Sequence, residues 1–158
     1  CIQPMYNLVK RQAEVEILPM AEAENLGVMT YSPLGGGLLT GKYGPDKRPP
    51  SGRLVEDGIF QVRYGDDWMY DVAGRFAGFA AEHGFDPAAL AVAWVGSHPA
   101  VTAPIIGARN VEQLEGSLGA AEIKMTSALR EEISALSPAP PPATDRNEEW
   151  TAVNYGVR

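Results

Sequence analysis

Short apolar segments alternate along this chain with longer amphipathic stretches, and this alternation limits the possible fold more than any other feature. Strand-like segments lie at residues 2–8, 28–31 and 101–106. Helical patterns or helix-start signals lie at residues 17–25, 68–83, 88–95, 110–118 and from 126 onward. Strands that alternate with helices form βαβ units around a parallel sheet. We therefore expect an α/β fold, although three strands are too few for a closed eight-stranded barrel, which needs about 250 residues.

The composition excludes several classes of protein. The chain has 158 residues and a formal net charge of −7, from 13 basic and 20 acidic side chains. Sequence-independent binding of nucleic acids depends on Lys and Arg that meet phosphates, so we expect no nucleic-acid partner. No apolar run approaches the roughly 20 residues of a membrane span, and the single cysteine, Cys1, cannot form an internal disulfide. These features predict no membrane association and a soluble, cytoplasmic, globular protein or a part of one.

Three helix starts carry clear local signals. Asp86 precedes Pro87, which is the pattern of an N-cap residue followed by proline in the first turn. Asn110 is followed three residues later by Gln113, as in a capping box. Thr126 begins the last helical pattern. These three signals predict where helices begin in the second half of the chain.

Two other regions lack such patterns. Residues 44–67 are rich in Gly, Pro and charge without a steady period, which predicts a functional loop or a disordered segment. Prolines within residues 138–142 end the last helix, and we expect residues 144–158 to form a polar tail over a surface. The chain is thus divided into a main part, residues 1–143, and a tail, residues 144–158.

The first candidate binding site is the turn after the second strand, which reads Ser32-Pro33-Leu34-Gly35-Gly36-Gly37. Three consecutive glycines leave their backbone N–H groups unobstructed, and such turns bind phosphates; a flexible turn is the alternative. Residues 36–42 also match the G-x-x-x-x-G-K pattern of a P-loop. However, Tyr43 stands where Ser or Thr would bind Mg²⁺, and two leucines lie inside the loop, so the P-loop interpretation is weak.

The second candidate binding site lies at residues 106–113, where a strand ends, a turn of small residues follows and a capped helix begins. The first turn of a helix offers free N–H donors and the positive end of the helix dipole. Arg109 adds a guanidinium group suited to a phosphate monoester. The alternative is an ordinary capped helix with a solvated arginine. No His, Cys or carboxylate pair has the spacing of metal ligands, and no nucleophile has an adjacent base.

Three motifs together resemble the aldo-keto reductase family, in particular its bacterial members and its potassium-channel β-subunit branch. The motifs lie at residues 3–8, 31–43 and 106–115, in the order and with the spacing of that family. The resemblance covers nearly all of this chain but only the C-terminal part of the family fold. It implies the C-terminal portion of a (β/α)8 TIM barrel, about strands six to eight with their helices, incomplete as given.

The resemblance also implies an NADP(H) site. Its contacts would come from Gln3, Tyr31, Ser32, Pro33, Leu34, Gly35, Gly36, Gly37, Lys42, Arg53, Gly107, Arg109, Gln113 and Ser117. Gln3 would hold the nicotinamide carboxamide and Tyr31 would stack beneath the ring. The glycine turn, with Lys42 nearby, would wrap the pyrophosphate, and Arg53 would be the basic residue of the long loop that folds over the cofactor. Gly107 and Arg109 would meet the adenosine 2′-phosphate, which Gln113 would face, favouring NADPH over NADH.

Two departures from the family matter. Gly116 and Ser117 stand where the family usually has Glu-Asn against the adenosine. The serine hydroxyl can give one hydrogen bond, whereas a side-chain amide offers both a donor and an acceptor. In addition, the family's catalytic Asp, Tyr, Lys and His lie on its first four strands, ahead of this segment. The resemblance therefore implies an NADPH-dependent reductase of aldehydes and ketones, to which this chain supplies cofactor contacts but no catalytic residue. The alternative is a non-catalytic NADPH-binding or interaction module.

The partial barrel has a further consequence. Barrel strands pair on both sides and bury both faces, so three strands alone leave open edges and an exposed apolar face. We expect self-association through these edges. We expect a small carbonyl substrate to bind only in the full-length parent.

Overall fold

The computed structural model describes residues 1–142, and the tail predicted at residues 144–158 lies outside the described residues. Two short strands are present, β1 (Met29–Thr30) and β2 (Ala103–Pro104). The α-helices are α1 (Ile17–Ala23), α2 (Arg53–Glu56), α3 (Gly58–Arg63), α4 (Asp67–Glu82), α5 (Pro87–Gly96), α6 (Val111–Leu118) and α7 (Ser127–Ser134). Short 3-10 turns lie at Gln12–Glu14, Gly35–Gly37 and Gly119–Glu122.

Three chain segments run parallel in the centre of the fold. β1 pairs with β2, with Met29 opposite Ala103. On the other side of β1, Ile2 and Met5 form parallel bridges with Val28 and Tyr31. This arrangement confirms the α/β class with parallel pairing, whereas the numbering of the strands within a barrel stays a prediction.

The strand predicted at residues 2–8 is wrong beyond Tyr6. Asn7 and Lys10 exchange two backbone hydrogen bonds and close a turn. The side-chain oxygen of Asn7 also accepts the N–H of Val9 at 3.1 Å. A short polar side chain that bonds its own backbone two residues later favours a turn over a strand, which explains the early end.

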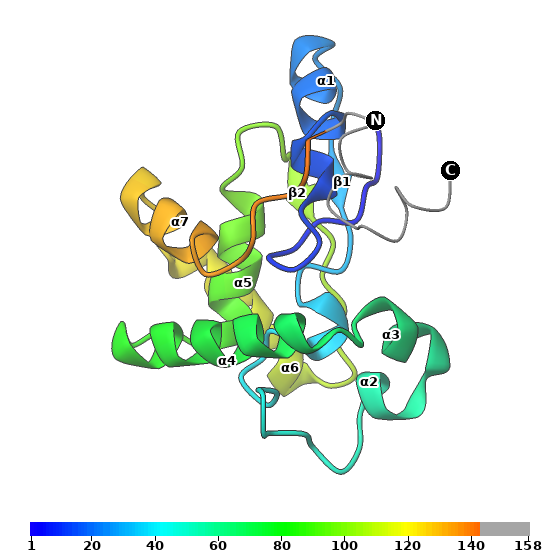
Figure 1. Ribbon diagram of the computed structural model, residues 1–158. Helices are drawn as coiled ribbons and strands as arrows, with labels where there is room; N and C mark the ends of the chain where they lie inside the picture. Colours follow the sequence, from blue (N-terminus) through cyan, green and yellow to red (C-terminus); the bar gives the residue numbers. More distant parts are fainter. Residues whose placement is uncertain (143–158) are drawn as a thin grey trace, which may run out of the picture.

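Helices cover one face of the parallel segments. In Figure 1, α4, α5 and α7 lie to one side of β1 and β2. Side chains alternate between the faces of a strand, and accordingly Val28 and Thr30 are fully buried while Met29 between them is 37% exposed. Ile105, the residue that follows β2, is 40% exposed. One-sided layering of this kind is consistent with a partial barrel whose inner face remains open.

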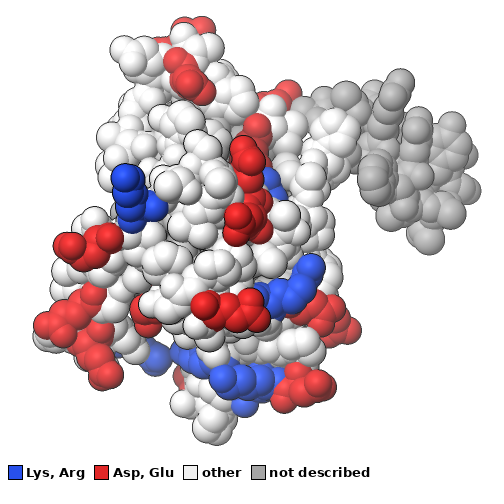
Figure 2. Space-filling view, turned by 90° about the vertical axis from the view of Figure 1, so that its left-hand side faces the viewer, with Lys and Arg blue, Asp and Glu red and all other residues white. Residues whose placement is uncertain are grey.

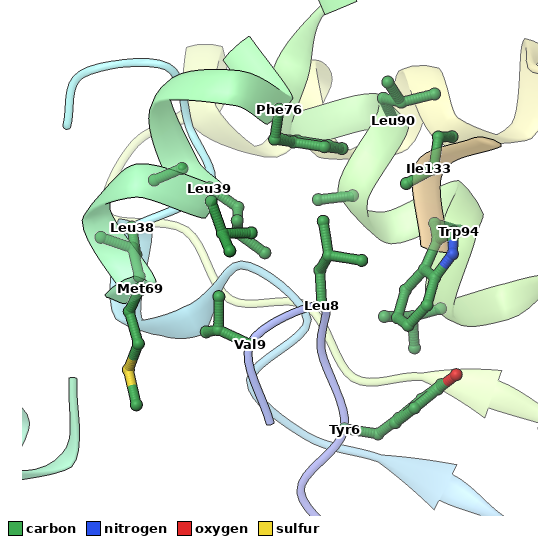
Figure 3. Packing of buried hydrophobic residues seen from close by; sticks show 14 of the residues in the cluster. Tyr6, Leu8, Val9, Leu38, Leu39, Met69, Phe76, Leu90, Trp94 and Ile133 are labelled. Atoms are coloured by element: carbon green, nitrogen blue, oxygen red, sulfur yellow. The ribbon is translucent and has the colours of Figure 1, made fainter. Parts of the chain in front are cut away.

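The core lies between this sheet and the helices (Figure 3). The nearly all-apolar α5 runs through it, with Leu90 and Val95 fully buried and Trp94 at 1% exposure. Tyr6 and Leu8 enter from the N-terminal segment, and Phe76 from α4. Burial of each such side chain contributes about 1.5–3 kcal/mol, so packing rather than the short strands holds the fold together.

The predicted helix caps are confirmed. Asp86 accepts the N–H of Ala89 at 2.8 Å and starts α5. Asn110 accepts the N–H of Gln113 at 2.9 Å and starts α6. Thr126 starts α7 in the same way, through the N–H of Leu129.

The expectation of a loop without helices at residues 44–67 is wrong. Helices α2 and α3 lie within it, and the side chain of Asp57 between them caps α3 by accepting the N–H of Ile59 at 2.9 Å. Helices of four and six residues are too short to show a periodic pattern, so their stability depends on contacts elsewhere. Phe60 of α3 supplies such a contact, since it packs against the hydrophobic core.

Two surface properties complete the description. Acidic and basic side chains are interspersed on the face shown in Figure 2. No helix within residues 1–142 is both long enough and apolar enough to cross a membrane.

Candidate functional site

An open cleft of about 960 Å³ lies between the glycine turn after β1, the start of α2, the start of α5 and the β2–α6 connection. It brings together twelve of the predicted site residues: Tyr31, Ser32, Pro33, Leu34, Gly36, Gly37, Lys42, Arg53, Gly107, Arg109, Gln113 and Ser117. Two predicted residues do not line it. Gly35 is buried beneath the turn, and Gln3 is exposed on the N-terminal segment beside β1.

The glycine turn has an unusual backbone. Ser32, Gly35, Gly36 and Gly37 all have positive φ, between 58° and 100°. The turn closes on itself, because the N–H of Gly35 donates to Ser32 and that of Gly37 to Leu34, each at 3.0 Å. Of the three glycine N–H groups, this leaves Gly36 for a ligand. Two of the three N–H groups are thus used within the turn, so the anion-binding capacity of this part of the cleft depends largely on side chains.

Gly36 is required by close packing as well as by its backbone conformation. A Cβ atom at this position would lie 2.7 Å from the ring of Phe60 and 3.1 Å from Leu54. The absence of a side chain thus allows α2 and α3 to close against the turn. This contact places Arg53, the first residue of α2, at the edge of the cleft.

A fully buried asparagine supports the turn from below. The side-chain nitrogen of Asn7 donates to the carbonyl of Ser32 at 2.9 Å and to the hydroxyl of Tyr64 at 3.3 Å. One side chain therefore joins the N-terminal segment, the turn and the residue that ends α3. Sequence reasoning included Asn7 in a motif but assigned it no role, because its partners are distant in sequence.

The start of α6 forms the opposite wall. Asn110 caps the helix, so one of its first N–H groups is satisfied by a side chain. Gln113 does not complete the expected capping box with Asn110. Its side-chain oxygen accepts the N–H of Arg109 at 3.2 Å, one residue earlier. This contact fixes the turn before the helix.

Three cationic side chains line the cleft, namely Lys42, Arg53 and Arg109. Within residues 1–142 the structure has a single ion pair, Arg11–Glu14, so none of the three is neutralised by a carboxylate. The ammonium of Lys42 lies within 4 Å of the Cβ positions of Gly37 and Gly52, so a side chain at either glycine would crowd it. Burial and the neighbouring charge of Arg109 lower the pKa of Lys42. Carboxylates also line the cleft, but none of them lies within ion-pair distance of the three cations, so these cations can attract an anion.

Eleven further residues line the cleft, namely Thr40, Glu56, Asp57, Asp86, Ala88, Ile105, Ile106, Ala108, Asn110, Glu112 and Gly116. Four of them, Ile106, Ala108, Asn110 and Glu112, belong to the second candidate site predicted at residues 106–113. Glu56, Asp57 and Asp86 could not be placed there from the sequence, because α2, α3 and α5 meet the cleft only through the tertiary fold. Thr40 has a structural contact, since its hydroxyl donates to the carbonyl of Gly37 at 2.7 Å.

The lining of the cleft suits the binding of a phosphorylated ligand. Lys42 lies in a turn and not at the start of a helix, which the P-loop interpretation would need. Among the described residues no group of three or more His, Cys, Asp or Glu side chains is placed to hold a metal ion. Basic groups, a tight glycine turn and a helix start around an elongated space can hold a phosphorylated ligand.

Comparisons with known proteins relate the chain as a whole to one family. The model of the aldo/keto reductase family matches residues 1–138. The uncharacterized oxidoreductase YrpG of Bacillus subtilis is 34% identical over 152 residues, which cover 94% of this chain and 43% of that protein. A probable voltage-gated potassium channel subunit beta of Oryza sativa subsp. japonica is 33% identical, over 90% of this chain and 45% of that protein.

Among solved structures, a glycerol dehydrogenase from Gluconobacter oxydans matches with a TM-score of 0.69 and 30% identity. The match covers 90% of this chain and 45% of that one. The chain thus spans less than half the length of these relatives.

Proposed function

The chain belongs to the aldo/keto reductase family, and from that premise we propose that it forms the cofactor-binding part of an NADPH-dependent reductase of aldehydes and ketones. Membership supports an oxidoreductase with a nicotinamide cofactor. The observation that carries the preference for NADPH is that Lys42, Arg53 and Arg109 line one cleft and that none of them forms an ion pair with the carboxylates that also line it.

The residues of the cleft fit a phosphorylated dinucleotide. The 2′-phosphate would bind at the start of α6, where Arg109 offers a guanidinium fork and the helix end favours negative charge. Lys42 and Arg53 would neutralise the pyrophosphate beside the glycine turn.

Tyr31 and Leu34 would bound the other end of the ligand. The ring of Tyr31 is half-buried at the end of β1 and lines the cleft, where it can support an aromatic ring by stacking. Bound NADPH supplies a hydride to a carbonyl carbon. Gln3 is exposed on the neighbouring segment, and its contact with the carboxamide requires the ligand to extend past Tyr31 toward the N-terminal segment.

We place the proton donor of the reaction outside these 158 residues. The chain spans 43–45% of three of its relatives. The cleft-lining side chains described above bind and orient rather than transfer protons. A non-catalytic NADPH-binding module is the second candidate, favoured by similarity to the potassium channel subunit beta.

Titration of the purified chain with NADPH, with NADH as the comparison, tests the proposal. We expect saturable binding by calorimetry, with NADPH preferred at least tenfold, because two to three charge-assisted hydrogen bonds to the 2′-phosphate are absent for NADH. Arg109→Met is expected to weaken NADPH binding about thirtyfold and to change NADH binding less than threefold. Arg75→Met, an exposed change on α4 away from the cleft, is the matched control and should change neither.

Two outcomes contradict the proposal. The first is absence of binding of both dinucleotides by the folded chain. The second is an equal loss of NADPH and NADH binding in Arg109→Met. Oxidation of NADPH by the chain alone in the presence of a small aldehyde would instead show that the proton donor lies within these residues.

A further inference from the structure

The surroundings of Lys42 differ from those of a lysine at the protein surface. Lys42 is half-buried and lines the cleft, where its ammonium comes within 4 Å of the Cβ positions of Gly37 and Gly52. No carboxylate within residues 1–142 forms an ion pair with it. By contrast, Lys47 is exposed and donates to the carbonyl of Gly41 at 2.9 Å. The amine of Lys42 is thus held inside a binding space without a negative partner.

These surroundings favour the uncharged form of the Lys42 amine. Burial, and after it the charge of Arg109, lower the pKa of Lys42 below its ordinary value. Only the uncharged amine has a free electron pair, so a lysine that is desolvated or lies beside another cation is the kind that attacks carbonyl carbons. Lys42 therefore has the properties of a nucleophile as well as those of a cation.

Two arginines in the same cleft can select the carbonyl compound. Arg53 and Arg109 line the cleft together with Lys42, and a guanidinium group binds a phosphate through paired N–H donors. A phosphate bound there holds the rest of a small molecule close to the amine and raises its effective concentration. The cleft, of about 960 Å³, has room for such a molecule. An aldehyde that carries a phosphate should therefore react at Lys42 in preference to a neutral one.

We propose that Lys42 is a covalent modification site for phosphorylated aldehydes, whose phosphate binds Arg53 and Arg109 while the amine forms an imine with the carbonyl carbon. The amine nitrogen adds to this carbon, and the carbonyl oxygen leaves as water with the two protons of the amine. No oxidant or reductant takes part, and hydrolysis reverses the step. The inference goes beyond the proposed function, since it needs no dinucleotide.

The test uses the full 158-residue chain without nucleotide and two matched aldehydes, para-formylphenyl phosphate and the neutral para-methoxybenzaldehyde. Cyanoborohydride reduces each imine to a stable amine, and peptide mass mapping then gives the labelling rate of each lysine. We expect the phosphate compound to label Lys42 at least about tenfold faster than the other lysines, Lys10, Lys47 and Lys124. The neutral compound should favour Lys42 by less than about threefold.

A change at the phosphate anchor tests the geometry. Arg109→Met should slow the labelling of Lys42 by the phosphate compound about tenfold, the effect of losing one charge-assisted hydrogen bond. Labelling by the neutral compound should change less than about threefold, because it has no group for Arg109 to bind. Arg75→Met, an exposed change on α4 away from the cleft, is the matched control and should alter neither rate.

Three results would each overturn the inference: labelling of Lys42 no faster than that of the other lysines, equal rates at Lys42 for the two aldehydes, or an unchanged rate in Arg109→Met. The comparison of the two aldehydes on the wild-type chain requires no variant, so it decides the inference even if Arg109→Met unfolds. Selective labelling of a folded chain that binds no dinucleotide would support the inference and overturn the proposed function. Binding of NADPH without selective labelling would do the reverse.

Discussion

Two polar regions of this molecule contrast in how their charged groups are satisfied. In the first, the Tyr6 cluster (Tyr6, Arg11, Glu14, Trp94, Arg130 and Ser134), side chains bind one another. The hydroxyl of Tyr6 donates to Glu14 at 2.6 Å and accepts from Arg130 at 2.9 Å. In the second, the cleft, Lys42, Arg53 and Arg109 face a shared space without a carboxylate partner in the part of the chain that the structure describes.

The Tyr6 cluster shows how a polar network can serve structure alone. Arg130 of α7 also donates to the carbonyl of Trp94 and to the hydroxyl of Ser97, and Arg11 donates to the carbonyl of Ser134. These contacts fasten α7 and α5 to the N-terminal segment. Groups satisfied in this way have little left to offer a ligand, whereas the cleft keeps its charges and the Ser117 hydroxyl available.

The largest expected effect comes from breaking the Tyr6 cluster. Arg130→Met removes the donor to the Tyr6 hydroxyl, the donor to the Ser97 hydroxyl, and one of the two side-chain donors to the Trp94 carbonyl. We expect a loss of about 3 kcal/mol in the free energy of unfolding, measured with urea. The matched change in the cleft, Arg109→Met, should alter that free energy by less than about 0.5 kcal/mol. Equal losses in the two variants would abolish the contrast between the regions.

A smaller effect concerns the response of the Tyr6 cluster to acid. Burial by itself raises the pKa of Glu14, but hydrogen bonds from Arg11 and Tyr6 and the charges of Arg11 and Arg130 outweigh it and lower the pKa below the ordinary 4.5. A carboxyl with a lowered pKa stabilises the fold fully above 4.5 and loses this contribution as the pH falls through its folded-state pKa.

Urea unfolding measured from pH 6 to pH 3 tests this response. The wild-type free energy of unfolding should fall more steeply below pH 4.5 than that of Glu14→Gln, by about 1 kcal/mol over the range. Parallel curves for the two proteins would show that Glu14 gains nothing from its partners.

The smallest expected effect sharpens the description of the cleft. Glu112 lies in the first turn of α6 and lines the cleft beside Arg109, so its charge opposes a bound anion. Glu112→Gln should raise the affinity for NADPH about threefold at low salt, the scale of one screened charge interaction. A loss of affinity in the same titration would instead assign Glu112 to a ribose hydroxyl.

Local signals in the sequence predicted much of this fold. The caps at Asp86, Asn110 and Thr126 are confirmed because each depends on a side chain and an N–H group three residues away. The glycine turn could likewise be recognised because its residues are consecutive in the sequence. Helices α2 and α3 were missed because helices of four and six residues are too short to show a hydrophobic period. The strand at residues 2–8 was predicted too long because the turn at Asn7 depends on polar contacts that a hydrophobic pattern does not reveal.

By itself, then, the sequence determined the alternation of parallel segments and capped helices, the glycine turn and the motifs of the family. Only the tertiary structure decided that Lys42 and Arg109 face one cleft, that Asn7 holds Ser32, and that the Ser117 hydroxyl is buried without a partner. The physical reason is the range of the interactions. Helix caps and turns form between residues a few positions apart, whereas the charge and hydrogen-bond balance of a cleft depends on which distant segments the core packs together.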